Sequence, residues 1–326
     1  MKPAFSVIFL TTLIGAAQGL FLALFTAQSY ALFGLLPNQD SRSFYALGTL
    51  LVFIISALGL ASSFLHLGRP ERAWRSAAMW RTSWLSREVI VLPVFMGVML
   101  LYGLAHYTGW SPVLVTLPDG VEIDVSVVLG VIGTVLAFAL FIATGMVYSC
   151  MRFMQEWHSP LTVINYIMLG GASGFTLAAA FATSQAPELA GFFAGWALII
   201  TLLAFASRGA SLIRNSRLRP KSTLQTAIGI KHPRIVQRSA GFLGGSFNTR
   251  EFFHGSSLST LRSVKWVFLG TVFLAPVLLL MAGLWMDFPG ALALAFAVQY
   301  LGLLAERWFF FAQVNHPQNL YYEAIS

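Results

Sequence analysis

Long apolar stretches alternate with short polar connections along the chain. A run of about 18 or more apolar residues can cross a bilayer core of roughly 30 Å as a helix, because the helix satisfies its own backbone hydrogen bonds. Eight segments qualify, at residues 5–33, 46–67, 89–107, 127–148, 161–183, 187–206, 264–286 and 291–311. The pattern predicts an all-α integral membrane protein, with eight transmembrane helices in one membrane domain over residues 1–326.

The composition supports this fold class. Hydrophobic residues make up 57% of the 326 residues, charged residues make up 10%, and the mean hydropathy is +0.74. These values exclude an ordinary soluble domain. The first apolar run is too long for the core of a signal peptide and lacks a convincing cleavage site, so we expect it to be a retained helix.

The distribution of basic residues predicts the orientation. Placing both termini and the connections 2–3, 4–5 and 6–7 on one side gathers 19 of the 20 basic residues there and leaves only Arg42 opposite. Because short basic connections stay in the cytoplasm, we expect this side, with both termini, to be cytoplasmic. On the other side, the stretch "TLPDGVEIDVS" combines a Pro-Asp-Gly turn with alternating residues, which predicts a small external hairpin.

Cofactor and catalytic signatures are missing. Cys150 is the only cysteine, so this chain cannot hold an iron-sulfur cluster alone. We expect no haem and no other metal site, because all histidines lie at helix ends or in connections, at His66, His106, His158, His232, His254 and His316. The glycine-rich "GFLGGSFNTREFFHG" lacks the Gly-Lys-Ser/Thr of a phosphate-binding loop.

The longest polar segment is the connection at residues 207–263. It carries one acid, Glu251, and ten basic residues, namely Arg208, Arg214, Arg217, Arg219, Lys221, Lys231, Arg234, Arg238, Arg250 and Arg262. Such a segment either contacts anionic lipid headgroups or docks a soluble subunit. Its many apolar residues favour docking, to which we expect Arg72, Arg75 and Arg81 to contribute. Nucleic acid is the weakest candidate partner, because membrane topology already explains the basic charge.

The stretch "HLGRPERAWRSAAMWRTSWLSREV", residues 66–89, concentrates polar chemistry between two apolar runs. Pro70 suits the first turn of a helix, and basic residues recur every three positions at Arg69, Arg72 and Arg75. Trp74 and Trp80 give the same segment an apolar side. We therefore expect a short helix lying at the membrane interface.

His66 and Glu88 stand at the two ends of that stretch. We expect Ser86 to cap the third membrane helix and Glu88 to lie in its first turn, at the membrane depth of His66. Arg87 stands near enough to tune both groups. A quinone site needs such proton-exchanging groups in the membrane, although ordinary interfacial polar residues would give the same pattern.

The motifs "HLGRPERAW" and "SWLSREV" resemble the membrane-anchor subunits of the dimethyl sulfoxide reductase family, which are related to polysulfide reductase and NrfD-type membrane subunits. The resemblance implies quinone binding by His66 and Glu88, and we add Arg69 and Arg87 to this set. The segment "VYSCMRFMQEWHSPLT" resembles the family at Tyr148, and Gln18 does so more loosely. An alternative for Gln18 is an ordinary hydrogen bond between helices.

The resemblance further implies two four-helix bundles and a complex of three subunits in the bacterial cytoplasmic (inner) membrane. A molybdopterin catalytic subunit and an iron-sulfur subunit would dock on the cytoplasmic face, while this chain binds ubiquinone or menaquinone without being catalytic itself. Segment 207–263 is similar to the anchors of cytoplasmic sulfite-oxidising complexes. We therefore favour electron flow from sulfite to quinone.

The sequence is compatible with three alternative functions. The chain could anchor a dimethyl sulfoxide reductase that takes electrons from menaquinol, or it could be a purely structural anchor. A secondary transporter is the alternative from another class, and it would need ionisable groups near the membrane midplane. We expect only Gln18, Asn165 and Gln299 to be strongly polar within the spans.

Overall fold

The computed structural model describes residues 4–118, 120–219, 221, 223–235, 257–286 and 288–317. Within these residues, eight helical segments are long and apolar enough to cross a membrane, which confirms the predicted fold class. They are α1 (Phe5–Leu32), Ser41–Phe64 with α2 (Leu47–Phe64), α3 (Trp84–Thr108), α4 (Val125–Ser149), α5 (Pro160–Gln185), α6 (Pro187–Ser216), Leu258–Trp285 with α9 (Leu258–Leu269) and α10 (Ala275–Trp285), and α11 (Pro289–Ala312). Short π-helical turns, Ser41–Ala46 and Gly270–Leu274, complete the second and seventh spans.

Local sequence signals set the ends of these helices. The carboxylate of Asp124 accepts a hydrogen bond of 2.9 Å from the Val127 amide and caps α4. Proline occupies the first turn of α5, α6 and α11, where its missing N–H costs no hydrogen bond. Gly109 ends α3 in the left-handed conformation, with φ of 71°.

The sixth span is longer than predicted. It continues to Ser216 instead of ending at residue 206, so the connection expected from residue 207 begins ten residues later. The polar sequence "SRGASLIRNS" suggested a loop, but Arg208 and Ser211 are buried against neighbouring helices. Tertiary packing therefore extends the helix past the end of the apolar run.

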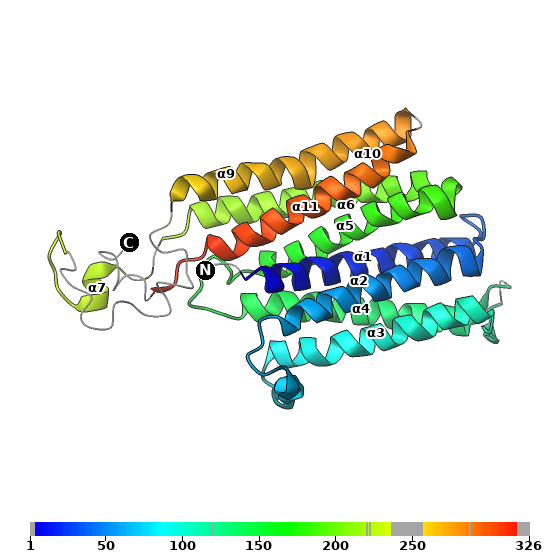
Figure 1. The fold of residues 1–326 in the computed structure, drawn as a ribbon, viewed down its shortest axis with the longest axis horizontal. Helices are drawn as coiled ribbons and strands as arrows, with labels where there is room; N and C mark the ends of the chain where they lie inside the picture. Colours follow the sequence, from blue (N-terminus) through cyan, green and yellow to red (C-terminus); the bar gives the residue numbers. More distant parts are fainter. Residues whose placement is uncertain are drawn as a thin grey trace.

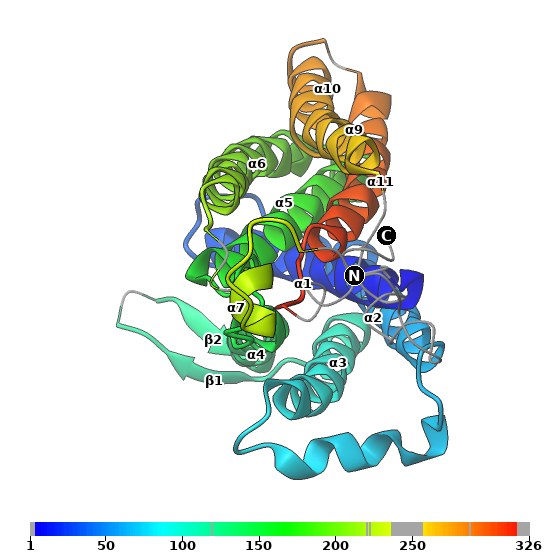
Figure 2. The same ribbon diagram turned by 90° about the vertical axis from the view of Figure 1, so that its left-hand side faces the viewer.

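The spans form two groups of four (Figure 2). In the first group α1 contacts α2 and α4, and α3 contacts α2 and α4. In the second group α5 contacts α6 and α11, and α10 contacts the same two helices. Contacts of α5 with α1 and α4, and of α11 with α1, join the groups, which gives the pair of four-helix bundles that the family resemblance implied.

Glycines allow α1 and α5 to approach closely. A Cβ atom on Gly174 would overlap the main chain of Gly19, and one on Gly19 would overlap the carbonyl oxygen of Gly170. Neither position has room for a side chain. The Gly170-x-x-x-Gly174 motif therefore serves helix packing.

The connections segregate to the two ends of the molecule (Figure 1). The start of α1, the end of α11 and the short helix α7 (Leu224–Ile228) lie at one end, which we call the basic end. Strands β1 (Val113–Thr116) and β2 (Glu122–Asp124) lie at the other end and pair antiparallel, which confirms the predicted hairpin.

A 3₁₀ helix, Pro70–Met79, connects α2 to α3 at the basic end. None of its residues is buried, and Trp74 is 71% exposed. Residues three apart in a 3₁₀ helix lie on one line, so the arginines at 72 and 75 share an edge. The predicted short helix is present, with 3₁₀ geometry.

Candidate functional site

A small cavity with a mixed polar and apolar lining lies among five of the spans, α1, α3, α4, α5 and α11. Its polar lining is Thr11, Thr12, Gln18, Glu88, Thr144, Tyr166, Ser173 and Arg307. Apolar side chains, among them Leu10, Phe141 and Leu303, complete the walls. The volume is about 20 Å³, enough for about one water molecule. Ionisable groups of opposite charge therefore face one internal space.

Glu88 reaches this cavity from α3. Ser83, not Ser86 as predicted, caps this helix, so Glu88 is its fifth residue and lies one turn deeper than expected. Thr144 of α4 donates a hydrogen bond of 2.7 Å to Glu88 Oε1. The residue as a whole is partly exposed, but its carboxylate is held by a neighbouring helix at the cavity and does not act as a surface partner of the helix dipole.

Gln18 lines the same cavity from α1. Its side-chain Nε2 donates a hydrogen bond of 2.7 Å to the backbone oxygen of Ala137 in α4, and its side chain is buried. The bond between helices that we considered as an alternative is therefore present. It also holds the Gln18 amide against the cavity wall.

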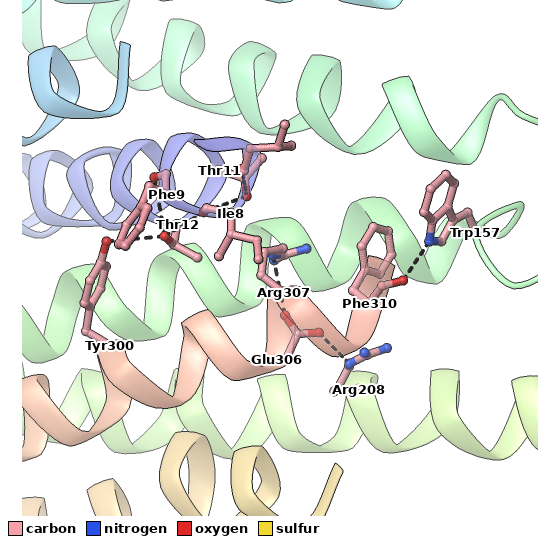
Figure 3. Close-up of polar contacts among 11 residues, drawn as sticks. Ile8, Phe9, Thr11, Thr12, Trp157, Arg208, Tyr300, Glu306, Arg307 and Phe310 are labelled. Carbon is pink, nitrogen blue, oxygen red and sulfur yellow. Dashed lines mark hydrogen bonds and ion pairs between the residues drawn. The ribbon is translucent and has the colours of Figure 1, made fainter. Parts of the chain in front are cut away.

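Three charged side chains, Arg208, Glu306 and Arg307, are buried beside the cavity (Figure 3). Arg208 Nε of α6 lies 2.8 Å from Glu306 Oε1, and Arg307 Nε lies 3.5 Å from Glu306 Oε2. Their side chains are at most 5% exposed. The prediction that Arg208 docks a partner is wrong, because this side chain is enclosed by α6, α9 and α11.

Glu306 and Arg307 are not among the site residues predicted from the sequence. Our expectation that only Gln18, Asn165 and Gln299 are strongly polar within the spans is therefore wrong. The signal was present, because an adjacent acid and base inside an otherwise apolar segment require partners within the bundle.

Aromatic rings surround Arg307. Its guanidinium carbon lies 3.9 Å from the centroid of the Tyr166 ring and 5.4 Å from that of Phe310. Tyr148 stacks on Tyr166 with ring centroids 5.9 Å apart, behind the cavity wall and outside the lining. Trp157 Nε1 donates to the Phe310 oxygen at 2.9 Å and fixes this cluster (Figure 3).

Three residues that we had grouped with Glu88 lie outside the cavity lining. His66 is exposed beyond the end of α2, and partial burial lowers the pKa of its imidazole below 6.5. Arg69 is exposed and precedes the 3₁₀ helix. Arg87 donates to the backbone oxygens of Trp80 and Arg81 at 3.0 and 2.9 Å, so it fixes the turn before α3 and makes no ion pair with Glu88.

The remaining basic residues predicted to dock a partner differ in exposure. Those that lie exposed in the described part of the chain are Arg72, Arg75, Arg81, Arg217, Arg219, Lys221 and Arg234. Arg214 donates to the backbone oxygens of Gln155 and His158 at 3.0 and 2.9 Å, so it also holds the connection between α4 and α5. Arg238 lies outside the described residues.

Comparison with known proteins decides the family. The sequence-family model for the DMSO reductase anchor subunit (DmsC) matches residues 1–305. The chain belongs to the DmsC family. The match confirms the family resemblance that was based on the motifs around His66 and Glu88. Together with the eight membrane spans, it identifies the chain as a multi-pass membrane protein.

A full-length relative narrows the comparison. The chain is 53% identical over 326 residues, covering 100% of both proteins, to a sulfite dehydrogenase subunit of Allochromatium vinosum. The similarity between this DmsC-family member and the sulfite dehydrogenase subunit therefore includes segment 207–263. This is the segment whose sequence resembles the anchors of sulfite-oxidising complexes.

Proposed function

We propose that this chain is the membrane anchor subunit of a sulfite dehydrogenase complex and that quinone reacts at the cavity around Glu88. Membership of the DmsC family and full-length identity of 53% to a sulfite dehydrogenase subunit support the first part. The observation that carries the second part is Glu88, an ionisable group held by Thr144 at the wall of a cavity between membrane spans.

The lining residues fit a quinone oxygen. Arg307, Thr144 and Tyr166 are donors, and the Glu88 carboxylate is an acceptor that can also carry a proton. The apolar walls suit a hydrophobic ring. Because the cavity has room for about one water molecule, binding of the whole ring requires the surrounding side chains to move apart.

Each residue then has a definable task. Quinone itself supplies the chemistry of taking up two electrons and two protons. Glu88 holds and delivers a proton at its carboxylate, and Thr144 fixes the direction of that carboxylate. The hydrogen bond from Gln18 to the Ala137 backbone oxygen fixes α1 against α4 at the site. Leu10 and Leu303 line the cavity and keep bulk water out. His66 exchanges protons with the aqueous phase at the basic end.

The basic end is proposed as the cytoplasmic side, with both termini there, because positively charged connections stay inside. Within the described residues, Arg42, at the start of the second span, is the only lysine or arginine at the opposite end. An iron-sulfur subunit and a molybdopterin catalytic subunit would dock on the exposed cations of the basic end. Electrons would pass from sulfite through those subunits to ubiquinone or menaquinone in the bilayer.

The test follows quinone reduction by sulfite in membranes that carry the intact complex. We expect Glu88→Gln to slow this reaction about 100-fold or more, because a general acid–base group contributes 10²–10⁴-fold. Sulfite oxidation with a soluble dye acceptor should stay unchanged, as should both rates in the control Glu71→Gln, whose carboxylate is exposed. Unchanged quinone reduction in Glu88→Gln would exclude the assigned site.

The same membranes distinguish the alternatives. Reduction of dimethyl sulfoxide by a reduced quinol, without sulfite-driven reduction, would reverse the proposed electron flow. Purification in mild detergent separates an anchor from a transporter. We expect a molybdenum and iron-sulfur pair to co-purify with the chain, whereas a stable single chain without cofactors would contradict the proposal.

A further inference from the structure

Four charged side chains lie in or beside the cavity, namely Glu88, Arg208, Glu306 and Arg307, and their formal charges sum to zero. Arg208, Glu306 and Arg307 form a buried network with two positive charges and one negative charge. Burying a net charge among membrane spans is costly unless an opposite charge lies nearby. The network therefore needs one further anion.

Glu88 is the acidic side chain that shares the cavity with this network. Among the described residues, Glu88 and Arg307 are the only charged side chains that line the cavity. They come from α3 and α11, which belong to different four-helix groups. With Glu88 ionised, the four groups are neutral as a set, so the cavity lies between a compensating pair.

The geometry of Arg307 leaves part of its guanidinium for a ligand. A guanidinium carries five N–H donors, and here Nε faces Glu306 at 3.5 Å while one face of the group lies 3.9 Å from the centre of the Tyr166 ring. Both contacts fix its position without using the two terminal nitrogens as ion-pair donors. Arg208 holds the other oxygen of Glu306 and so steadies the network.

We propose that Arg307 is a second quinone-binding residue, which donates to a ring oxygen and acts as the charge counterpart of Glu88. This inference rests on the proposed function. When Glu88 takes up a proton, the buried network is left with a surplus positive charge. That surplus favours negative charge on a bound oxygen, because preorganised donors stabilise developing charge most strongly where water is excluded. The Arg208–Glu306 pair acts as a positioning element.

Ligand binding gives the first test. Decylubiquinone and menadione are titrated into the purified, assembled complex, and the dissociation constant is measured without turnover. We expect Arg307→Gln to weaken binding of the preferred quinone about tenfold or more, and Arg307→Lys to weaken it less, because charge is kept and the planar donor fork is lost. Arg42→Gln, an exposed arginine at the opposite end of the molecule with no part in docking, is the control and should bind as the unchanged protein does.

The outcomes separate the two proposals. Weaker binding in Glu88→Gln with unchanged binding in Arg307→Gln would overturn this inference and leave the proposed function standing. Unchanged binding in both variants would overturn the proposed site as well. Weaker binding in both, with Arg42→Gln unchanged, supports both proposals.

A double-mutant cycle tests the charge pairing without any ligand. Thermal unfolding midpoints of the complex are compared for Glu88→Gln, Arg307→Gln and the double variant. Each single variant leaves one uncompensated charge, whereas the double variant restores neutrality beside the intact Arg208–Glu306 pair. We expect the double variant to lose clearly less than the sum of the single losses. Additive losses would show that Glu88 and Arg307 do not compensate each other and would overturn the inference.

Discussion

Arg208 and Glu306 form an ion pair of 2.8 Å in which both side chains are at most 2% exposed. The pair links α6 to α11 inside the second four-helix group. Arg208 therefore serves the interior of the bundle, whereas Arg217, nine residues later, lies exposed beyond the end of the same helix. Two arginines of one segment thus have opposite environments.

Replacing Arg208 should destabilise the protein. Removing one partner of a buried ion pair leaves an uncompensated charge and costs about 3–5 kcal/mol. We expect this loss in the free energy of unfolding for Arg208→Gln, measured by chemical unfolding in detergent. The control Arg217→Gln should change it by less than about 0.5 kcal/mol, as for other exposed positions. Equal stability of the two variants would contradict the buried role of Arg208.

Thr144 should matter through its hydroxyl. Thr144→Val keeps the shape of the side chain but removes the donor to Glu88 Oε1. We expect quinone-coupled turnover to fall about tenfold, since a hydrogen bond to a charged group contributes about 1.5–3 kcal/mol. Thr144→Ser retains a hydroxyl and should keep most of the activity. If valine and serine gave the same rate, the hydrogen bond would have no functional part.

We expect quinone-coupled turnover to depend on pH through His66. Partial burial lowers its pKa below 6.5, so the imidazole is neutral at pH 7 and gains a proton only in more acidic solution. The folded chain then binds fewer protons than the unfolded chain, so any stabilisation from neutral His66 is present above pH 6.5 and is lost as the pH falls. We expect quinone-coupled turnover to show an inflection below pH 6.5, measured from pH 5 to 8.

His66→Ala should remove that inflection and lower the rate about tenfold, a modest loss because water can partly replace an exposed proton carrier. The exposed His232 provides the control, since His232→Ala should leave the profile unchanged. Persistence of the inflection in His66→Ala would assign it to another group.

Exposed cations of the basic end should hold the soluble subunits. Replacing Arg217, Arg219 and Lys221 together by glutamine should release those subunits from membranes at a lower salt concentration, because exposed charge pairs are screened by salt. Release is measured by quantifying the soluble subunits after salt washes. Arg214 is left out, because it holds the backbone of the connection between α4 and α5. Unchanged release would place docking on another surface, such as that of Arg72 and Arg75.

The contact between α1 and α5 should not tolerate a methyl group. Gly174→Ala would push Cβ into the Gly19 backbone, so we expect little assembled protein in the membrane. Gly97→Ala is the matched control, because a Cβ atom there meets no atom within 4 Å. The amount of chain in detergent extracts measures the difference. Equal amounts for both variants would mean that the two helices can separate without loss.

The fold was largely predictable from sequence because the bilayer imposes one simple rule. Every span must be a helix of sufficient apolar length, and the sequence shows eight such runs. Helix ends were less predictable, since they depend on tertiary contacts. Burial of Arg208 and Ser211 carries α6 to Ser216, and Ser83 caps α3 three residues before the expected position.

The site was predictable only where local motifs carried it. Glu88 and Gln18 were identified from their sequence context, and both line the cavity. Arg307 and Tyr166 were missed because they come from distant spans, and only packing brings them to Glu88. His66 lies close to Glu88 in the sequence motif, yet it lies outside the cavity lining, since a 3₁₀ helix and a turn separate the two helix ends.

The close backbone contact of Gly19 with Gly170 and Gly174 has a consequence for motion. Alternating-access carriers rock one bundle against the other around a substrate site, and this requires an interface that can slide. Here the main chains of α1 and α5 touch at these three glycines, so sliding at this contact would force peptide groups into one another. We therefore expect the two halves to stay fixed relative to each other and ligand entry to depend on side-chain rearrangement around Glu88 and Arg307.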